Sequence, residues 1–336
     1  MHMKTDSVVS STEQLQLINT IKAQIRQAQY QTILQVNSQL ILLYWQIGTL
    51  LNENAAYGNS FVERLAAEIR SDFPRMKGFS VRNLWYMKKF AAMTDKEILQ
   101  TVSAELPWSH NIVLMEKVKD MEPRLWYARK AIENGWSKNV LTHQIEGRLY
   151  ERQETAPKIS NFSQLLSKPQ SELARDTMKD PYIFDFIEMR EDMLERDIED
   201  ALVKDVTKTM LELGKGFAFV GQQYHLNVGG DDFFIDLLFY NLNLRCYFVI
   251  ELKTGDFKPE YAGQLNFYLS AVDSQLRHEW DNPSIGLILC KNKNNVVAEY
   301  SLRDMSKPMG VSEYRLTREL PEDLKTQLPT GADFNK

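Results

Sequence analysis

Apolar residues recur at helical spacing through the first 150 residues of the chain. Between residues 13 and 51 they lie three or four positions apart, which predicts one long helix or two. Ser60 and Ser80 each stand directly before such a pattern, in the position of a helix N-cap. We therefore expect further helices over residues 60–73 and 81–93, and a mostly helical first domain.

The pattern changes after residue 150, where regular spacing fades among prolines and polar side chains. The later expected elements are a helix at 191–213, strands at 217–228, 233–240 and 245–253, a helix at 261–275, a strand at 285–290, a short helix at 296–302 and a strand at 311–316. This order, α-β-β-β-α-β, predicts a mixed sheet flanked by helices. The chain is thus α/β overall, with a helical domain at 13–150, a linker at 151–179 and a second domain at 180–328.

The two strands at 233–240 and 245–253 have the aromatic and aliphatic composition of a buried hairpin. If the hairpin folds symmetrically about Asn243 and Leu244, Asp236 lies opposite Glu251, with Cβ atoms about 5 Å apart. Because side chains alternate along a strand, Lys253 projects from the same face as Glu251. An acid pair and a lysine are therefore expected to converge inside an apolar sheet.

Such an acid pair points to a bound cation, since burying unpaired carboxylates is very costly. Hard oxygen ligands suit Mg²⁺ or Mn²⁺. We expect Asp236 and Glu251 to be ligands, with the backbone carbonyl of Leu252 beside them.

The order of these residues along the chain resembles a known superfamily. Asp236, then Glu251-Leu252-Lys253, then Gln264 and Tyr268 in QLNFY, is similar to PD-(D/E)XK nucleases with a Gln-x-x-x-Tyr motif. Phrases such as RNLWYMKKFA, LPWSHN, KDPYIFDF, LGKGFAFVGQQYHL and IELKTGDFKPEYAGQLNFYLSAVD extend the resemblance to the YhcG-type family over nearly the whole chain. Ile235 stands where the superfamily name has proline, which is not a ligand.

This resemblance implies a restriction-endonuclease-like second domain that hydrolyses DNA phosphodiester bonds with a divalent metal. Lys253 is then expected to orient or help deprotonate the attacking water and to stabilise negative charge. Gln264 and Tyr268, one helical turn apart, are expected to face the site and to contact substrate or brace Lys253. A further acid is implied on the preceding helix, where Glu199 is favoured and Glu195 is the alternative.

A basic stretch in the first domain is the candidate nucleic-acid surface. Residues 74–93 contain no acid, and their five basic residues are Arg75, Lys77, Arg82, Lys88 and Lys89. Two short helices joined by a glycine-containing turn fit a helix-turn-helix or winged-helix arrangement that contacts phosphates. The alternative is a solvated basic face on a helix that packs through its apolar side.

Composition narrows the class of protein. Hydrophobic residues make up 43% and charged residues 25% of the chain, as in an ordinary soluble protein. No apolar run reaches the length of a membrane span, and the N-terminus lacks the layout of a signal peptide, so we expect a cytoplasmic protein with no membrane partner. The only cysteines, Cys246 and Cys290, lie in apolar runs and are expected to be buried free thiols.

Two functional hypotheses from different classes follow. The first is a DNA endonuclease of restriction, mobile-element defence or recombination, as the resemblance implies. The second is a nucleic-acid-binding or scaffold protein whose nuclease fold is idle or needs a partner. RNA is a further candidate substrate, because the phosphate chemistry is shared. Related nucleases often dimerise, so a homodimer is also implied, as are partner proteins of a restriction-modification or defence system.

Overall fold

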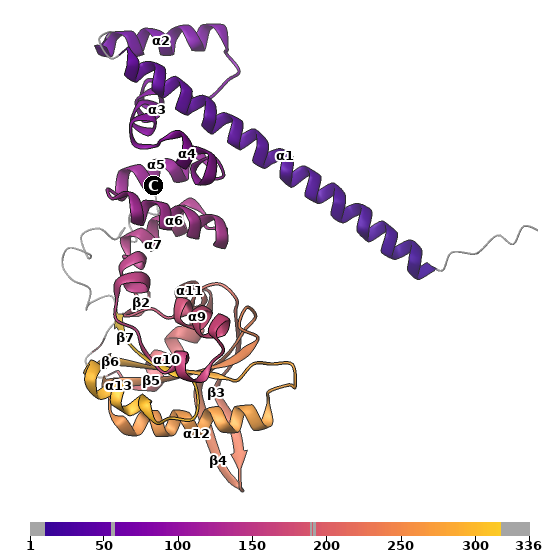
Figure 1. The fold of residues 1–336 in the computed structure, drawn as a ribbon, viewed down its shortest axis with the longest axis vertical. Coiled ribbons are helices and arrows are strands. Elements are labelled where there is room, and N and C mark those ends of the chain that lie inside the picture. The colour runs from indigo at the N-terminus through magenta and orange to yellow at the C-terminus, as the bar shows by residue number, and fades with distance from the viewer. Residues whose placement is uncertain (1–10, 55–57, 189, 191–192, 317–336) are drawn as a thin grey trace, which may run out of the picture. The chain divides into compact units, whose positions relative to one another are not determined.

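The structure is a computed structural model that describes residues 11–54, 58–188, 190 and 193–316. It divides the chain into two compact units, Met1–Thr142 and His143–Lys336, and each is described by itself (Figure 1). The expected C-terminal limit at 328 and the expected helix start at 191 lie outside the described residues.

The first unit is built from helices. These are α1 (Ser11–Glu53), α2 (Gly58–Asp72), α3 (Val81–Met93), α4 (Lys96–Ile98), the π-helical turn η2 (Leu99–Ser103), α5 (Trp108–Lys117), α6 (Met121–Asn134) and most of α7 (Lys138–Glu146). The pattern over 13–51 forms one helix, and Ser80 caps α3 by accepting a hydrogen bond from Asn83 N. The expected cap at Ser60 is wrong, because α2 begins at Gly58 and Ser60 lies in its first turn. The described part of this unit contains no strand, so the strands of a winged helix are not seen there.

The second unit surrounds a seven-stranded sheet. Its strands are β1 (Ile159–Ser160), β2 (Tyr182–Phe184), β3 (Phe217–Val228), β4 (Asp231–Asn241), β5 (Cys246–Asp256), β6 (Ile285–Asn292) and β7 (Met309–Leu316). Their order is β1-β7-β6-β5-β4-β3, with β2 pairing β7. The β3–β4–β5 ladders are antiparallel, whereas β5–β6–β7 are parallel. The expected mixed sheet is therefore confirmed.

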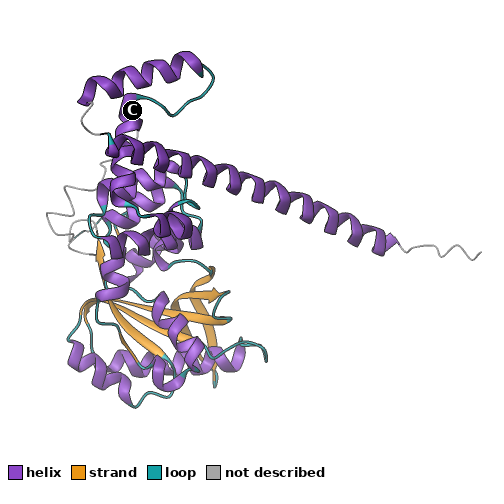
Figure 2. Ribbon diagram, turned by 45° about the horizontal axis from the view of Figure 1, so that its top comes forward, coloured by secondary structure: helices purple, strands orange, loops and turns teal. Residues whose placement is uncertain are grey.

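Helices cover both faces of this sheet (Figure 2). On one face α12 (Pro259–Gln275) and α13 (Asn295–Arg303) contribute to a core that includes Leu238 and Val249. On the other face α10 (Glu195–Lys204) and α11 (Val206–Leu213) pack with Phe248, Ile250 and Leu252. Strand β5 thus alternates as its sequence predicted, and the buried thiols of Cys246 and Cys290 lie in opposite cores.

The side chains of strand β4 change from one face of the sheet to the other next to the predicted site. Side chains two apart on a regular strand share a face, yet Ile235 lies in the core under α12 and Leu237 in the core under α10. The change of face occurs at Asp236. On the paired strand β3, the ladder shifts register between Phe219 and Gly221.

Two expected elements differ in the structure. The helix expected over 191–213 is interrupted at Asp205, which ends α10 and caps α11 by accepting a hydrogen bond from Lys208 N at 3.3 Å. The expected linker at 151–179 is folded: it holds η3 (Glu151–Thr155), β1, α8 (Phe162–Leu165) and α9 (Lys168–Thr177). Its apolar residues Phe162 and Met178 are fully buried in the core. The prediction of a linker, which rested on the polar composition of the segment, was therefore wrong.

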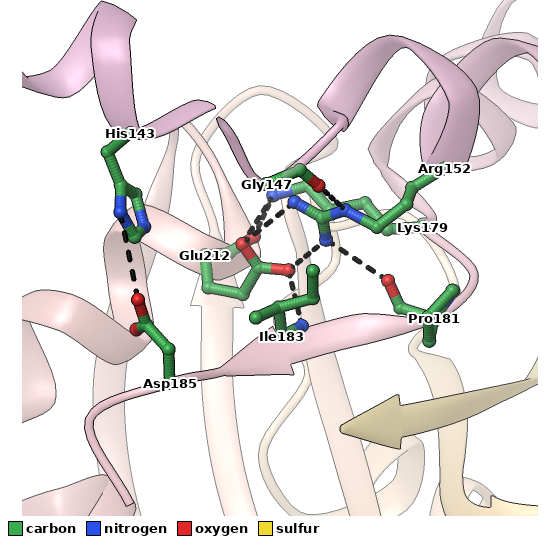
Figure 3. Close-up of polar contacts among 8 residues, drawn as sticks. All are labelled: His143, Gly147, Arg152, Lys179, Pro181, Ile183, Asp185 and Glu212. Carbon is green, nitrogen blue, oxygen red and sulfur yellow. Dashed lines mark hydrogen bonds and ion pairs between the residues drawn. The ribbon is translucent and has the colours of Figure 1, made fainter. Parts of the chain in front are cut away.

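A buried ion network ties this segment to the rest of the second unit (Figure 3). The carboxylate of Glu212 on α11 pairs with Arg152 and lies 3.8 Å from the Lys179 ammonium. It also accepts a hydrogen bond from Ile183 N at 2.8 Å, while Arg152 donates to the carbonyl of Pro181 at 3.0 Å. The three charged side chains are each at most 6% exposed. Segments far apart in sequence are therefore joined by charges that water does not screen.

No helix within the described ranges is both long and apolar enough to cross a membrane.

Candidate active site

The β4–β5 hairpin brings the predicted carboxylates together. Leu237 pairs with Ile250, so the next position places Asp236 opposite Glu251, in the register that the turn predicted. Glu251 is 2% exposed. Leu252 N donates a hydrogen bond to Asp236 Oδ2 at 2.8 Å, which fixes the aspartate against the backbone between the two other site residues of β5.

Lys253 lies among three carboxylates. Its Nζ is 3.3 Å from Glu195 Oε2, 3.5 Å from Glu251 Oε2 and 4.0 Å from Asp236 Oδ2. The ring of Tyr261 lies beneath the ammonium, with its centroid 5.4 Å from Nζ. Since the lysine side chain is 9% exposed, these acids and the ring replace most of its hydration.

Both acids that the sequence offered on the preceding helix lie at the site, in different positions. Glu195 begins α10, and besides Lys253 it accepts a hydrogen bond from Thr254 N at 3.3 Å. Glu199 is 2% exposed and accepts a hydrogen bond from Gln223 Nε2 at 2.7 Å. The same Nε2 donates to Asp236 Oδ1 at 3.3 Å. Glu199 therefore reaches the site through Gln223.

Sequence reasoning missed Gln223 and Tyr261. The signal for Gln223 was present as the polar pair Gln222-Gln223 inside a run that reads as a strand. Tyr261 lies one turn before Gln264 on α12, the helix that carries the Gln-x-x-x-Tyr motif.

Burial and like charges shift the acidity of the site. Burial raises the pKa of Glu251 to about 8, and the nearby Asp236 carboxylate adds to the rise. Burial also raises the pKa of Asp236 and of Glu199. Burial opposes the charged form of Lys253, but the carboxylates around it outweigh that effect and raise its pKa. The site therefore holds a charged lysine among acids whose ionisation is costly unless a second positive charge is bound beside them.

The two residues of the Gln-x-x-x-Tyr motif lie together on α12. Tyr268 is buried, and Gln264 is exposed and donates a hydrogen bond from Nε2 to the tyrosine hydroxyl at 3.1 Å. Burial raises the pKa of Tyr268, and the negative charges of Glu251 and Asp236 add to the rise. Tyr268 thus belongs to the electrostatic surroundings of the acid pair, and Gln264 holds its hydroxyl.

The residues present fit a divalent cation. Glu251 Oε1 is buried and, among the residues that the structure describes, receives no hydrogen bond. That orphaned oxygen, Asp236 and the Leu252 carbonyl form an all-oxygen donor set of the kind Mg²⁺ and Mn²⁺ prefer. Within the described ranges, no three His, Cys, Asp or Glu side chains enclose a metal position by themselves. A donor set of two carboxylates suits Mg²⁺, which commonly keeps several water ligands.

The predicted basic residues all lie on or before α3 in the first unit, in two kinds of environment. Arg75 and Lys77 are exposed on the connection between α2 and α3. Lys88 lies over the exposed ring of Trp85, with Nζ 5.0 Å from the centroid.

The other two basic side chains have partners within the protein. Arg82 donates a hydrogen bond to Tyr86 Oη at 3.1 Å, and that hydroxyl donates a hydrogen bond to the carboxylate of Glu116 on α5. Lys89 donates to the carbonyl of Met115 at 3.2 Å. The structure therefore places an acid beside a stretch whose own sequence contains none.

Comparison with known proteins identifies the class. Residues 175–329 match the YhcG PDDEXK nuclease domain, and residues 20–152 match the DUF1016 N-terminal domain. The chain is also 31% identical over 333 residues to the Escherichia coli (strain K12) protein named Putative nuclease YhcG, covering 88% of each chain. The second unit is thus a nuclease domain of the PDDEXK class. The chain as a whole belongs to the YhcG family.

Solved structures with partial similarity are a repair endonuclease from Pyrococcus abyssi and EndoMS in complex with double-stranded DNA. The first is 13% identical, with a TM-score of 0.26, over 38% of this chain and 49% of that chain. The second is 17% identical, with a TM-score of 0.26, over 39% of this chain and 48% of that chain. Each match spans about half the length of the solved chain.

Proposed function

We propose that the protein is a divalent-metal-dependent DNA endonuclease whose active site is formed by Asp236, Glu251 and Lys253. The observation that carries this proposal is the buried Oε1 of Glu251, which has no hydrogen-bond partner among the described residues and lies beside Asp236, with the Lys253 ammonium 3.5 Å from the other glutamate oxygen. Membership in a PDDEXK nuclease family supports the same reaction class.

Asp236, Glu251 and the Leu252 carbonyl would hold the cation. When bound, a divalent ion polarises the phosphate and lowers the pKa of water. Lys253 orients the attacking water and stabilises the negative charge that develops on the phosphate oxygens. Glu195 and the ring of Tyr261 keep the Lys253 ammonium directed at the acid pair. Tyr268 adds to the electrostatic surroundings of the acid pair, with its hydroxyl held by Gln264.

The first unit would supply contacts to DNA phosphates. Arg75 and Lys77 are exposed, and the Trp85–Lys88 pair presents an aromatic ring together with a positive charge. Phosphate contacts of this kind position a nucleic acid without reading its sequence. We place the activity in restriction, mobile-element defence or recombination, with a homodimer able to cut both strands.

The test is cleavage of supercoiled plasmid, linear duplex, branched DNA, single strands and RNA, in Mg²⁺, in Mn²⁺ and in chelator. We expect metal-dependent cleavage of DNA that Lys253→Ala lowers by at least about 100-fold, the scale for losing one preorganised charge stabiliser. Lys204→Ala removes an exposed lysine at the end of α10 and should leave the rate unchanged.

Equal cleavage by Lys253→Ala and the native chain would refute the mechanism. Salt-sensitive DNA binding without cleavage of any substrate would instead support an idle or partner-dependent scaffold. Preferential cleavage of RNA would change the proposed substrate from DNA to RNA, while the proposed active-site residues would stay the same.

A further inference from the structure

Gln223 has an unusual backbone conformation in the middle of β3. Its φ is +45°, in the left-handed region that residues other than glycine rarely occupy. The pairs Gln222↔Leu237 and Tyr224↔Ile235 flank it, so Gln223 lies opposite Asp236, where β4 changes face. Such strain persists only where the surrounding structure enforces it, and it clusters at functional sites.

The side-chain amide of Gln223 has two acidic hydrogen-bond partners. Gln223 Nε2 is 2.7 Å from Glu199 Oε2 and 3.3 Å from Asp236 Oδ1. Both partners accept hydrogen bonds when ionised, so the NH₂ group and not the amide oxygen must face them. One amide group therefore donates to a carboxylate of α10 and to a carboxylate of β4 at once.

Two-metal nuclease sites hold two divalent ions about 3.5–4 Å apart. A second cation between Glu199 and Asp236 would need the same two oxygens that Gln223 Nε2 already bonds. An amide NH₂ can satisfy the same two oxygens without adding charge. Glu199 is 2% exposed, so water contributes little to its carboxylate, and its hydrogen bonds come from the side chains of Gln223 and Gln222.

We propose that Gln223 is a positioning residue whose amide bridges Glu199 and Asp236 in place of a second cation, which leaves one cation position, at Asp236 and Glu251. The inference rests on the proposed metal-dependent function and deepens it. Glu199 then acts through Gln223: it anchors the amide, and the amide orients Asp236 toward the cation.

The experiment measures Mn²⁺ binding to the full chain without DNA, by calorimetric titration for stoichiometry and by electron paramagnetic resonance for coupling between ions. The native chain should bind one Mn²⁺ that Glu251→Gln abolishes, with an uncoupled spectrum. Gln223→Gly removes the amide and relieves the positive φ, so it should fold and bind Mn²⁺ about 10-fold more weakly, as expected for loss of a supporting hydrogen bond.

Gln223→Glu replaces the donor with a third carboxylate and should bind two Mn²⁺ with an exchange-coupled spectrum. The matched control is Asn227→Ala, because Asn227 Nδ2 donates to Asp232 Oδ1 at 3.0 Å between the same two strands, away from the site. This control should bind one Mn²⁺ with native affinity.

Two coupled Mn²⁺ ions in the native chain, no bound Mn²⁺, or native affinity in Gln223→Gly would each overturn the inference. These outcomes are separate from cleavage. A chain that binds one Mn²⁺ but cuts nothing keeps the role of Gln223 and loses the endonuclease proposal. A chain that cuts DNA while it holds two coupled ions keeps the endonuclease proposal and loses the role of Gln223.

Discussion

At the scale of single residues, the site contains buried carboxyl groups whose ionisation lowers the stability of the fold. Glu251 and Asp236 are acids inside an apolar sheet, and burial raises the pKa of both carboxyls. Buried acids with raised pKa values cluster at functional sites, and one ammonium group cannot balance two ionised carboxylates in the absence of a metal ion. Function and stability should therefore separate when one acid is made neutral.

Glu251→Gln tests this separation. Cleavage should fall by at least about 100-fold because a charged oxygen ligand is lost. The unfolding temperature in chelator should stay the same or rise, because an acid that is costly to ionise becomes a neutral amide of the same shape. Single-turnover cleavage and thermal unfolding of the same preparation measure both. A marked drop in unfolding temperature would mean that the ionised pair stabilises the fold.

At the scale of elements, helix α12 packs on the sheet through close contact with β6. A Cβ placed on Gly286 would lie 2.5 Å from Leu265 Cδ2 and 2.9 Å from Leu269 Cδ1, so these two leucines would have to shift. Gly263 lies on α12 itself and is exposed, and a Cβ placed there would meet no atom of the described residues within 4 Å. The two glycines thus differ in what an added methyl group meets.

Gly286→Ala and Gly263→Ala form a matched pair. The first should lower the free energy of unfolding by about 1–3 kcal/mol, the usual cost of overpacking. The second should raise it by up to about 1 kcal/mol, because alanine favours the helix. Urea unfolding followed by circular dichroism distinguishes them. Equal effects in both variants would show that α12 can move away from β6 without cost.

The buried network of Glu212, Arg152 and Lys179 also acts at this scale, by joining α11 to the segments around residues 152 and 179. Burial opposes ionisation of Glu212, but the two cations outweigh it and hold its pKa below the usual value. A carboxyl with a depressed pKa in the folded state contributes stability above its unfolded pKa of about 4.3, and this is lost as pH falls through the folded pKa.

Glu212→Gln should therefore destabilise the protein at pH 7 by about 3–5 kcal/mol, since two buried cations lose their anion. The deficit relative to the native chain should shrink below about pH 4, as Glu212 is protonated in the native chain too. Urea unfolding at pH 7, 5 and 3.5 measures the trend. A deficit that is constant across this range would show that Glu212 is not ionised in the fold.

At the scale of the whole molecule, the chain combines a unit with exposed basic residues and a unit with the nuclease site. Binding and cleavage should then respond to different substitutions. Electrostatic attraction to DNA appears in the salt dependence of affinity, whose slope falls by about 0.9 for each phosphate that the protein no longer neutralises.

The double variant Arg75→Ala, Lys77→Ala should weaken DNA binding and reduce this slope by about 2, without changing sequence preference. Arg82→Ala is the comparison: its guanidinium donates to Tyr86, whose hydroxyl hydrogen-bonds to Glu116, so the slope should fall by less than in the double variant. Fluorescence anisotropy with a labelled duplex at several salt concentrations measures both. An unaltered slope in the double variant would remove Arg75 and Lys77 from the interface.

The sequence by itself determined the parts that depend on short-range pattern. Alternation along two strands and the turn between them were enough to predict that Asp236 lies opposite Glu251 and that Lys253 shares the face of Glu251. Helix spacing and N-cap residues likewise located α3. These features follow from local geometry, which is the same wherever the element lies.

Only the tertiary structure decided which distant groups complete the site. Glu195, Gln223 and Tyr261 come from different elements, and their meeting with the acid pair depends on how α10, β3 and α12 pack. Packing also folded the polar segment 151–179 into the core and brought Glu116 beside Arg82. Such contacts depend on how much apolar surface the whole domain buries when it folds. The spacing of residues within one element contains no information about this.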